Sequence, residues 1–329
     1  MTARLDECLE LMQRDDVDAM ILGREANART VADTSRLWLA GTRPFSPACI
    51  VVRATQAVHV LANSSDAVPA GFPLAQLYGL TWNPDRLAAA LTAIPGLASA
   101  HRVAVDGMSP SMRALLERVA PGAVLVDAGE ILTDLWQRPD PDRASGVTAA
   151  AEVAAAGLAA MVGALAVGAL PRRLRGACAA AFAAFGVTTP AFEAVATPID
   201  PHSSIWTAPD RPFEPEERIV LRAGALRDGW EASLARTYQL TTSSVALDPP
   251  ARWNGLVAAC TAGATVGELR AKDAVVYGVG HGVEPWPDDF VLVPGLMCAL
   301  EASDDNCVRQ DVLQITETAP VIVTRVGSS

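Results

Sequence analysis

The chain has little of what nucleic-acid binding requires. Only one of its 26 basic residues is a lysine, Lys272, and the net charge at pH 7 is −11. Proteins that bind nucleic acid need a basic surface to neutralise the phosphates. We therefore expect no nucleic-acid partner.

The six cysteines form no Cys-x-x-Cys pair, and they are widely separated along the chain: Cys8, Cys49, Cys178, Cys260, Cys298 and Cys307. The first twelve residues are amphipathic and partly acidic, so they lack the basic and then apolar pattern of a secretory signal. Scattered thiols in a chain without such a signal predict a cytoplasmic location, where each cysteine acts as a small hydrophobic residue.

No apolar run is typical of a membrane span. Residues 149–170 are rich in alanine, but Glu152 and three glycines interrupt them. We expect a buried helix there and no membrane association. With 50% hydrophobic and 19% charged residues over 329 positions, the composition predicts a globular protein of two domains.

Residues 1–136 have the pattern of an α/β domain. Apolar residues at Leu5, Leu9 and Met12 recur at helical spacing, and residues 19–22 follow as a short buried strand. Further elements are expected as a hairpin over residues 48–52 and 57–61, helices over 85–93 and 109–119, and strands over 102–105 and 124–126.

Residues 137–143 are expected to form a linker, because two prolines and alternating charges there oppose both helix and strand. A second domain is predicted over residues 144–329. It should begin with an alanine-rich helix over 144–170 and a second helix over 174–185, and mostly β segments should follow.

Four segments of the second domain form a spaced set of motifs: Arg222-Ala223-Gly224 with Gly229-Trp230, Ser233 and Arg236-Thr237; then Gly280-His281-Gly282; then Pro294-Gly295 up to Glu301; then Arg309-Gln310-Asp311. Read in order, they resemble the carboxy-terminal half of the creatinase/aminopeptidase P/methionine aminopeptidase family, which has the pita-bread fold. That family holds two metal ions with two Asp, one His and two Glu.

Among the five ligand positions of the family, only His281 and Glu301 match the family's residue types. Arg222 and Ser233 stand at the two Asp positions, and Gln310 stands at the last Glu. A site with one carboxylate and a permanently charged guanidinium should not hold two divalent cations, so we expect no metal and no other cofactor. We predict instead that Arg222 occupies the place of the metal and bonds to Glu301; the alternative is that Arg222 points outward.

Three residues are candidates for catalysis. His281 lies between two glycines and could transfer protons near neutral pH; alternatively it is a structural histidine bonded to a carbonyl. His202 lies three residues before the position of the family's catalytic histidine, and its alternative is a loop residue facing solvent. Glu301 should be buried between apolar residues and therefore paired or neutral; its alternative is a purely structural ion pair with Arg222 or Arg309.

The remaining candidates are expected to bind substrate. Trp206, Trp230 and Trp286 should border one cavity, although core packing explains most tryptophans. Ser233 and Gln310 could supply hydrogen bonds in place of metal ligation. Arg222 would favour a substrate carboxylate, because its planar fork binds carboxylate at two points.

The resemblance implies an α+β fold, in which a pita-bread carboxy-terminal domain follows a smaller α/β creatinase-type domain, and it implies a homodimer. The predicted function is a metal-independent enzyme that acts on a small polar, carboxylate-bearing substrate by C–N bond hydrolysis or elimination. The alternative is an inactive pseudopeptidase that serves as a ligand- or protein-binding module. The charges of the motif residues argue against a third possibility, an active metallopeptidase.

Overall fold

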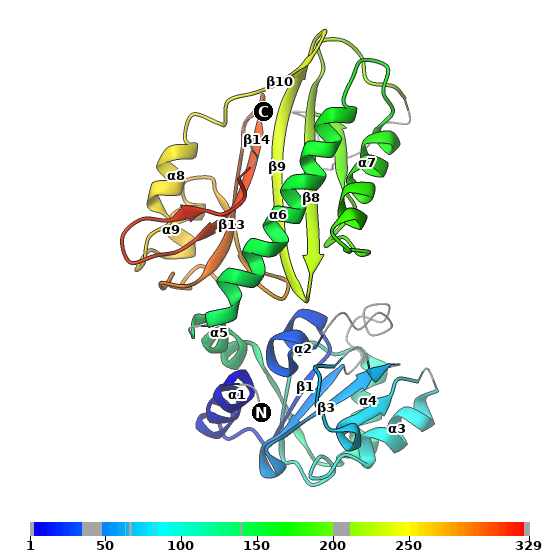
Figure 1. Cartoon of the computed structure of the whole chain (residues 1–329). Helices are drawn as coiled ribbons and strands as arrows, with labels where there is room; N and C mark the ends of the chain where they lie inside the picture. Colours follow the sequence, from blue (N-terminus) through cyan, green and yellow to red (C-terminus); the bar gives the residue numbers. More distant parts are fainter. Residues whose placement is uncertain are drawn as a thin grey trace. The chain divides into compact units, whose positions relative to one another are not determined.

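The computed structural model describes residues 3–34, 48–62, 64–65, 68–81, 83–138, 140–199 and 211–325. The chain forms two compact units, Met1–Arg138 and Pro139–Ser329 (Figure 1).

A six-stranded mixed sheet forms the centre of the first unit. Its strand order is β4-β3-β2-β1-β5-β6, and the strands are β1 (Ala19–Leu22), β2 (Cys49–Val52), β3 (Ala57–Ala62), β4 (Leu77–Gly79), β5 (Arg102–Val105) and β6 (Val124–Asp127). The predicted hairpin is present as the antiparallel pair β2 and β3, which a short 3-10 turn, η1 (Arg53–Thr55), connects. A second 3-10 turn, η3 (Leu74–Gln76), precedes β4.

Helices cover both faces of this sheet. They are α1 (Ala3–Arg14), α2 (Glu25–Ala32), α3 (Pro84–Thr92), α4 (Pro110–Val119) and α5 (Gly129–Gln137). Met20 and Leu22 of β1 pack with α1, α2 and α5, whereas Ala19 and Ile21 pack with α3 and α4. This alternation is what a strand buried on both faces requires. The predicted α/β domain is confirmed.

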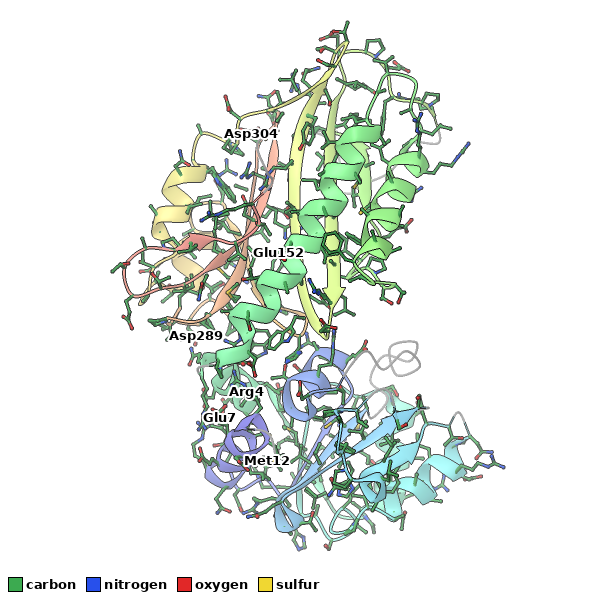
Figure 2. The ribbon with its side chains drawn as sticks, in the orientation of Figure 1. Arg4, Glu7, Met12, Glu152, Asp289 and Asp304 are labelled. Carbon is green, nitrogen blue, oxygen red and sulfur yellow. The ribbon has the colours of Figure 1, made fainter. Side chains whose placement is uncertain are left out.

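Polar contacts also join helices that are far apart in the sequence. Arg4 of α1 donates to Glu7 at 2.9 Å and to the carbonyl oxygen of Leu135 in α5 at 2.9 Å (Figure 2). All six cysteines are buried free thiols, so their predicted role as small hydrophobic residues is confirmed.

The second unit begins with a long helix, α6 (Pro141–Ala164), followed by α7 (Pro171–Ala184). The expected start at residue 144 was wrong, because Pro141 occupies the first helical position and Asp140 caps the helix by accepting from the Asp142 N–H. The expected end at residue 170 was also wrong, because the helix ends six residues earlier, at Ala164. By length and composition α6 could cross a membrane, a test that core helices of soluble proteins also pass.

A nine-stranded antiparallel sheet forms the centre of the second unit. Its main path is β12-β11-β13-β14-β9-β8-β7, with β10 paired to β9 and β15 paired to β14. The strands are β7 (Val195–Pro198), β8 (Arg218–Arg227), β9 (Trp230–Leu240), β10 (Ser244–Ala246), β11 (Val275–Val279), β12 (Val283–Glu284), β13 (Met297–Ser303), β14 (Val308–Gln314) and β15 (Val321–Ile322). Two short helices, α8 (Trp253–Ala259) and α9 (Val266–Arg270), precede β11.

The order of elements repeats within this unit. Two helices precede three antiparallel strands in each half: α6 and α7 before β7, β8 and β9, and then α8 and α9 before β11, β13 and β14. The two halves meet where β9 pairs with β14. The helices differ greatly in length, with 24 and 14 residues in the first half and 7 and 5 in the second. No sequence repeat indicated this symmetry.

The faces of β8 and β9 have different surroundings. Leu221 and Ala223 of β8 and Leu234 of β9 pack with α6 and α7 in one hydrophobic core. Because side chains alternate along a strand, Arg222 and Ser233 project from the opposite face. The predicted α+β architecture of the second unit, an antiparallel sheet with helices packed on one face, is confirmed.

Candidate functional site

Four residues form a row across four neighbouring strands of the second sheet. Glu301 of β13 pairs with Gln310 of β14, Gln310 pairs with Ala235 of β9, and Ala235 pairs with Arg222 of β8. Directly paired residues project from the same face of a sheet. Because Ala235 is small, the long side chain of Arg222 has room to extend over it.

Arg222 extends along this row and contacts both polar residues at its far end. Its Nε donates to Gln310 Oε1 at 2.7 Å, and its Nη2 donates to Glu301 Oε2 at 2.6 Å. The predicted bond between Arg222 and Glu301 is therefore confirmed, and the alternative of an outward-pointing arginine is wrong. Such charge-assisted bonds are the strong class of protein hydrogen bond.

Gln310 connects this ion pair to two hydroxyl groups. Its Nε2 donates to Ser233 Oγ at 2.8 Å and to Tyr277 Oη at 2.5 Å, and Arg222 also donates to Tyr277 Oη at 3.2 Å. Burial raises the pKa of Tyr277, so its hydroxyl stays protonated at neutral pH. Sequence reasoning missed Tyr277, because its place in the network depends on how β11 is aligned with β13.

The Arg222–Glu301 ion pair is partly exposed to solvent. The exposed fractions of the Arg222 and Glu301 side chains are 20% and 16%, whereas Gln310 is fully buried. The ring of Phe192 lies under the guanidinium, 5.5 Å from Arg222 Cζ. Gly224 is required beside this ring, because a Cβ there would lie 2.4 Å from a Phe192 carbon. The glycine of the Arg-Ala-Gly motif thus makes room for the aromatic support of Arg222.

His281 is held by the turn between β8 and β9. The exposed fraction of His281 is 7%, and its Nδ1 lies 3.2 Å from the carbonyl oxygen of Gly229. A carbonyl can only accept, so Nδ1 carries the proton, and in the neutral ring Nε2 has the lone pair. The ring stacks on Trp230 at 3.8 Å, and Trp230 packs against Gly146 of α6. This bond matches the structural alternative for His281, and its catalytic role stays a prediction.

Trp286 lies in a different environment from Trp230. Trp286 is 2% exposed, stacks on Phe290 at 4.2 Å and covers Gly278. Its packing is that of a core residue, and its predicted role in lining a substrate cavity stays untested. His202 and Trp206 lie outside the described residues.

The donor set does not fit the pair of metal ions that the family site holds. Glu301 contributes one carboxylate and is bonded to a guanidinium, while Ser233, Gln310 and Tyr277 contribute neutral groups bonded to one another. Divalent cations need several anionic or strongly donating ligands. In the described part of the chain, no three His, Cys, Asp or Glu side chains are grouped so that they could hold a metal ion.

Comparisons with known proteins support this description of the fold. The family model of the creatinase/prolidase N-terminal domain matches residues 4–135. Prolidase from Pyrococcus horikoshii OT3 is similar over 100% of this chain and 99% of its own, with a TM-score of 0.77 and 15% sequence identity. X-Pro aminopeptidase from Thermotoga maritima MSB8 is similar over 99% and 98%, with a TM-score of 0.72 and 14% identity.

Xaa-Pro dipeptidase from Bacillus anthracis is likewise similar over 99% and 98% of the two chains, with a TM-score of 0.72 and 13% identity. Among curated protein sequences, none matches this chain significantly. Residues 4–135 therefore match the creatinase/prolidase N-terminal domain, and the whole chain has the fold of the prolidase and X-Pro aminopeptidase structures. The resemblance inferred from the motifs is confirmed at the level of fold.

Proposed function

We propose that this chain is a metal-independent hydrolase or lyase of the creatinase fold that acts at a C–N bond of a small polar substrate. Its full-length structural neighbours are named as prolidases and X-Pro peptidases, which supports an enzyme that cleaves C–N bonds. The Arg222–Glu301 bond of 2.6 Å carries the metal-independent part of the proposal, because it places a fixed cation among the aligned ligand positions.

The same pair suggests the charge of the substrate. A zwitterion could insert between the two residues, with its carboxylate on Arg222 and its cationic group on Glu301. Arg222 and Glu301 would then each exchange one partner for another, so neither charge would lose its counterion on binding. The fork of Arg222 suits a carboxylate at two points. Gln310 and Ser233 would supply neutral hydrogen bonds beside it.

His281 is the first candidate for proton transfer. With Nδ1 donating to Gly229, Nε2 could accept a proton from water as the water oxygen attacks the carbon of the C–N bond; the leaving nitrogen would then receive that proton. His202 is the second candidate. Trp230, which stacks on His281, and Trp206 are proposed to line the substrate cavity beside that histidine. We also propose that the protein is a cytoplasmic homodimer without a nucleic-acid or membrane partner.

A second function has an observation in its favour. Arg222, Glu301, Gln310, Tyr277 and Ser233 bond to one another, so the network is already internally paired. Such pairing suits a pseudopeptidase that keeps the fold as a ligand- or protein-binding module. Under this alternative, a ligand stabilises the protein but no product forms.

Two measurements test the proposal. Elemental analysis of purified protein should find well under one equivalent of Mn, Fe, Co or Zn per chain; a full equivalent retained on dialysis would refute metal independence. A thermal-shift screen should then favour zwitterions over matched carboxylates and amines, and the shift should disappear in Arg222→Met and Glu301→Gln. Product formed from such a ligand by the wild type but not by His281→Ala supports the enzyme, whereas binding without turnover supports the module.

A further inference from the structure

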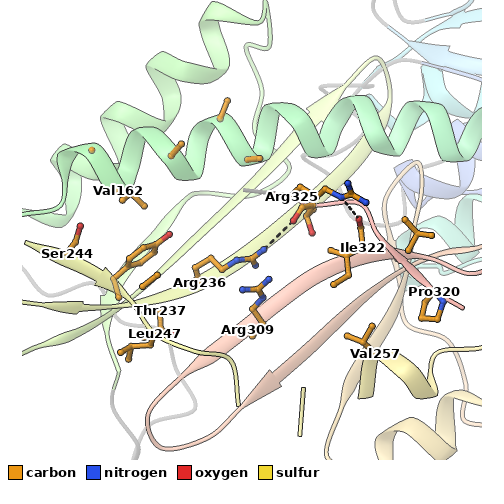
Figure 3. A pocket seen from close by; sticks show the side chains of 18 residues that line it. Val162, Arg236, Thr237, Ser244, Leu247, Val257, Arg309, Pro320, Ile322 and Arg325 are labelled. Atoms are coloured by element: carbon orange, nitrogen blue, oxygen red, sulfur yellow. Dashed lines mark hydrogen bonds between the residues drawn. The ribbon is translucent and has the colours of Figure 1, made fainter. Parts of the chain in front are cut away.

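A groove lies on the face of the second sheet that α6 covers, and none of the described site residues lines it. Its volume is about 1410 Å³. One wall is α6, with Ala155, Ala159 and Gly163, and strands β9 and β14 form the floor (Figure 3). Val257 of α8 and Val321 of β15 line the opposite side.

The repeat within this unit explains why the groove is open. In the first half, α6 extends for 24 residues along β8 and β9, but its counterpart in the second half, α8, has only 7 residues. The surface beside α6 therefore lacks a second long helix. The wall that α6 presents has small side chains, and Ala159 is exposed. Small side chains allow a second helix to approach closely, at the usual interaxial distance of about 8–10 Å.

The floor of the groove is positively charged. Arg236 and Arg309 share one carboxylate, that of Asp311, at 2.5 and 2.7 Å. Arg325 is exposed at the side of the groove, and its Nε donates to the carbonyl oxygen of Ile322 at 3.5 Å (Figure 3). No Asp or Glu is among the described residues that line the groove. Three guanidiniums and one carboxylate leave a surplus of positive charge.

We propose that this groove binds an amphipathic acidic helix from another protein. The volume exceeds the range of about 300–1,000 Å³ that is usual for small-molecule sites. Its straight helical wall, apolar sides and charged floor suit a helix whose apolar face packs on α6 and whose carboxylates face Arg309 and Arg325. This interaction does not depend on the function proposed for Arg222 and Glu301.

A displayed library of 18-residue helical peptides, randomised along one face, tests the proposal with the full-length protein. Peptides are selected for binding to the wild type and against Ala159→Trp, which fills the groove from its exposed wall. The selected peptides should carry net negative charge. Their affinity should fall about tenfold or more in Ala159→Trp and about fivefold in Arg325→Glu, the loss expected for one charge pair of roughly 1 kcal/mol.

Matched variants outside the groove serve as controls. Ala180→Trp and Arg173→Glu lie at exposed positions of α7 and should leave binding unchanged. If Ala159→Trp does not fold, Val321→Trp fills the groove from the other side, where Val321 is 41% exposed. The proposal is wrong if no selected peptide distinguishes the wild type from the filled variant, or if basic or neutral peptides are selected. Saturable binding of a dansylated undecanoate that Ala159→Trp abolishes would identify a small amphiphile instead.

Discussion

Strands β9 and β14, with their neighbours, carry two arginine–carboxylate groups on opposite faces, and the two groups differ in burial. On the face toward α6, Asp311 is fully buried between Arg236 and Arg309, and the Arg236 side chain is 9% exposed. On the other face, Arg222 and Glu301 are 20% and 16% exposed.

This difference in burial separates the charges that stabilise the fold from those that remain available to a ligand. Arg236 also donates to the carbonyl oxygens of Gln310 and Thr324, and Thr324 Oγ1 donates to Asp311, so this group connects β9, β14 and the segment after β15. Burial lowers the pKa of Arg236, and the charge of Asp311 opposes that shift. Removing a partner there leaves a buried charge, whereas the Arg222 group can exchange partners with water or a ligand.

The largest effect is expected from Asp311→Asn. This change keeps the shape of the side chain but leaves the Arg236 charge buried without a counterion, so the free energy of unfolding should fall by about 3–5 kcal/mol. Urea denaturation measures it, with the exposed Asp305→Asn as the control. A loss no greater than that of the control would show that the two faces do not differ.

The next largest effect is expected at the Trp230–His281 ring pair, where Trp230 packs against α6. In Gly146→Ala the new Cβ would lie 2.4 Å from the Trp230 ring, so we expect a loss of about 1–3 kcal/mol and a changed tryptophan fluorescence. Gly163→Ala on the same helix meets open space and should stabilise the protein by about 0.5–1 kcal/mol. Equal effects of the two substitutions would contradict the packing of Trp230 against α6.

A smaller loss of stability is expected when the Arg222–Glu301 pair is broken. Arg222→Met and Glu301→Gln should each cost about 1–2 kcal/mol, because water can solvate the partner that remains. The double variant should lose less than the sum of the two single losses. If Glu301→Gln destabilised the protein as much as Asp311→Asn does, the Arg222 group would be structural, and the proposed exchange with a zwitterion would fail.

The smallest effect appears only at high pH. Burial raises the pKa of Tyr277 above the unfolded value of about 10, so above that pH the unfolded chain loses the proton while the native chain keeps it. The unfolded state then binds fewer protons, and stability falls as the pH rises toward the native pKa. The free energy of unfolding of Tyr277→Phe, measured by urea titration, should fall less steeply with pH than that of the wild type between about pH 9.5 and 11. Identical slopes would indicate an exposed hydroxyl.

Much of the fold could be predicted from local pattern. The strands over 19–22 and 102–105 and the hairpin in the first unit follow from alternation and β-branched content. The error at the start of α6 came from reading Pro141 as a helix breaker, although proline is favoured in the first turn. The Arg222–Glu301 bond could be predicted because motif spacing aligned both residues with ligands of one family site.

The sequence by itself determined that two domains form, that the aligned metal positions carry a guanidinium, and that Glu301 is either paired or neutral. Only the tertiary structure decided that Tyr277 joins that pair, that His281 bonds to a turn carbonyl, and that a groove opens beside α6. The physical reason is that local pattern depends on residues within one helix or strand. Strand register and the unequal lengths of α6 and α8, by contrast, act between segments that are distant in the sequence, as Arg222 and Glu301 are at a separation of 79 residues.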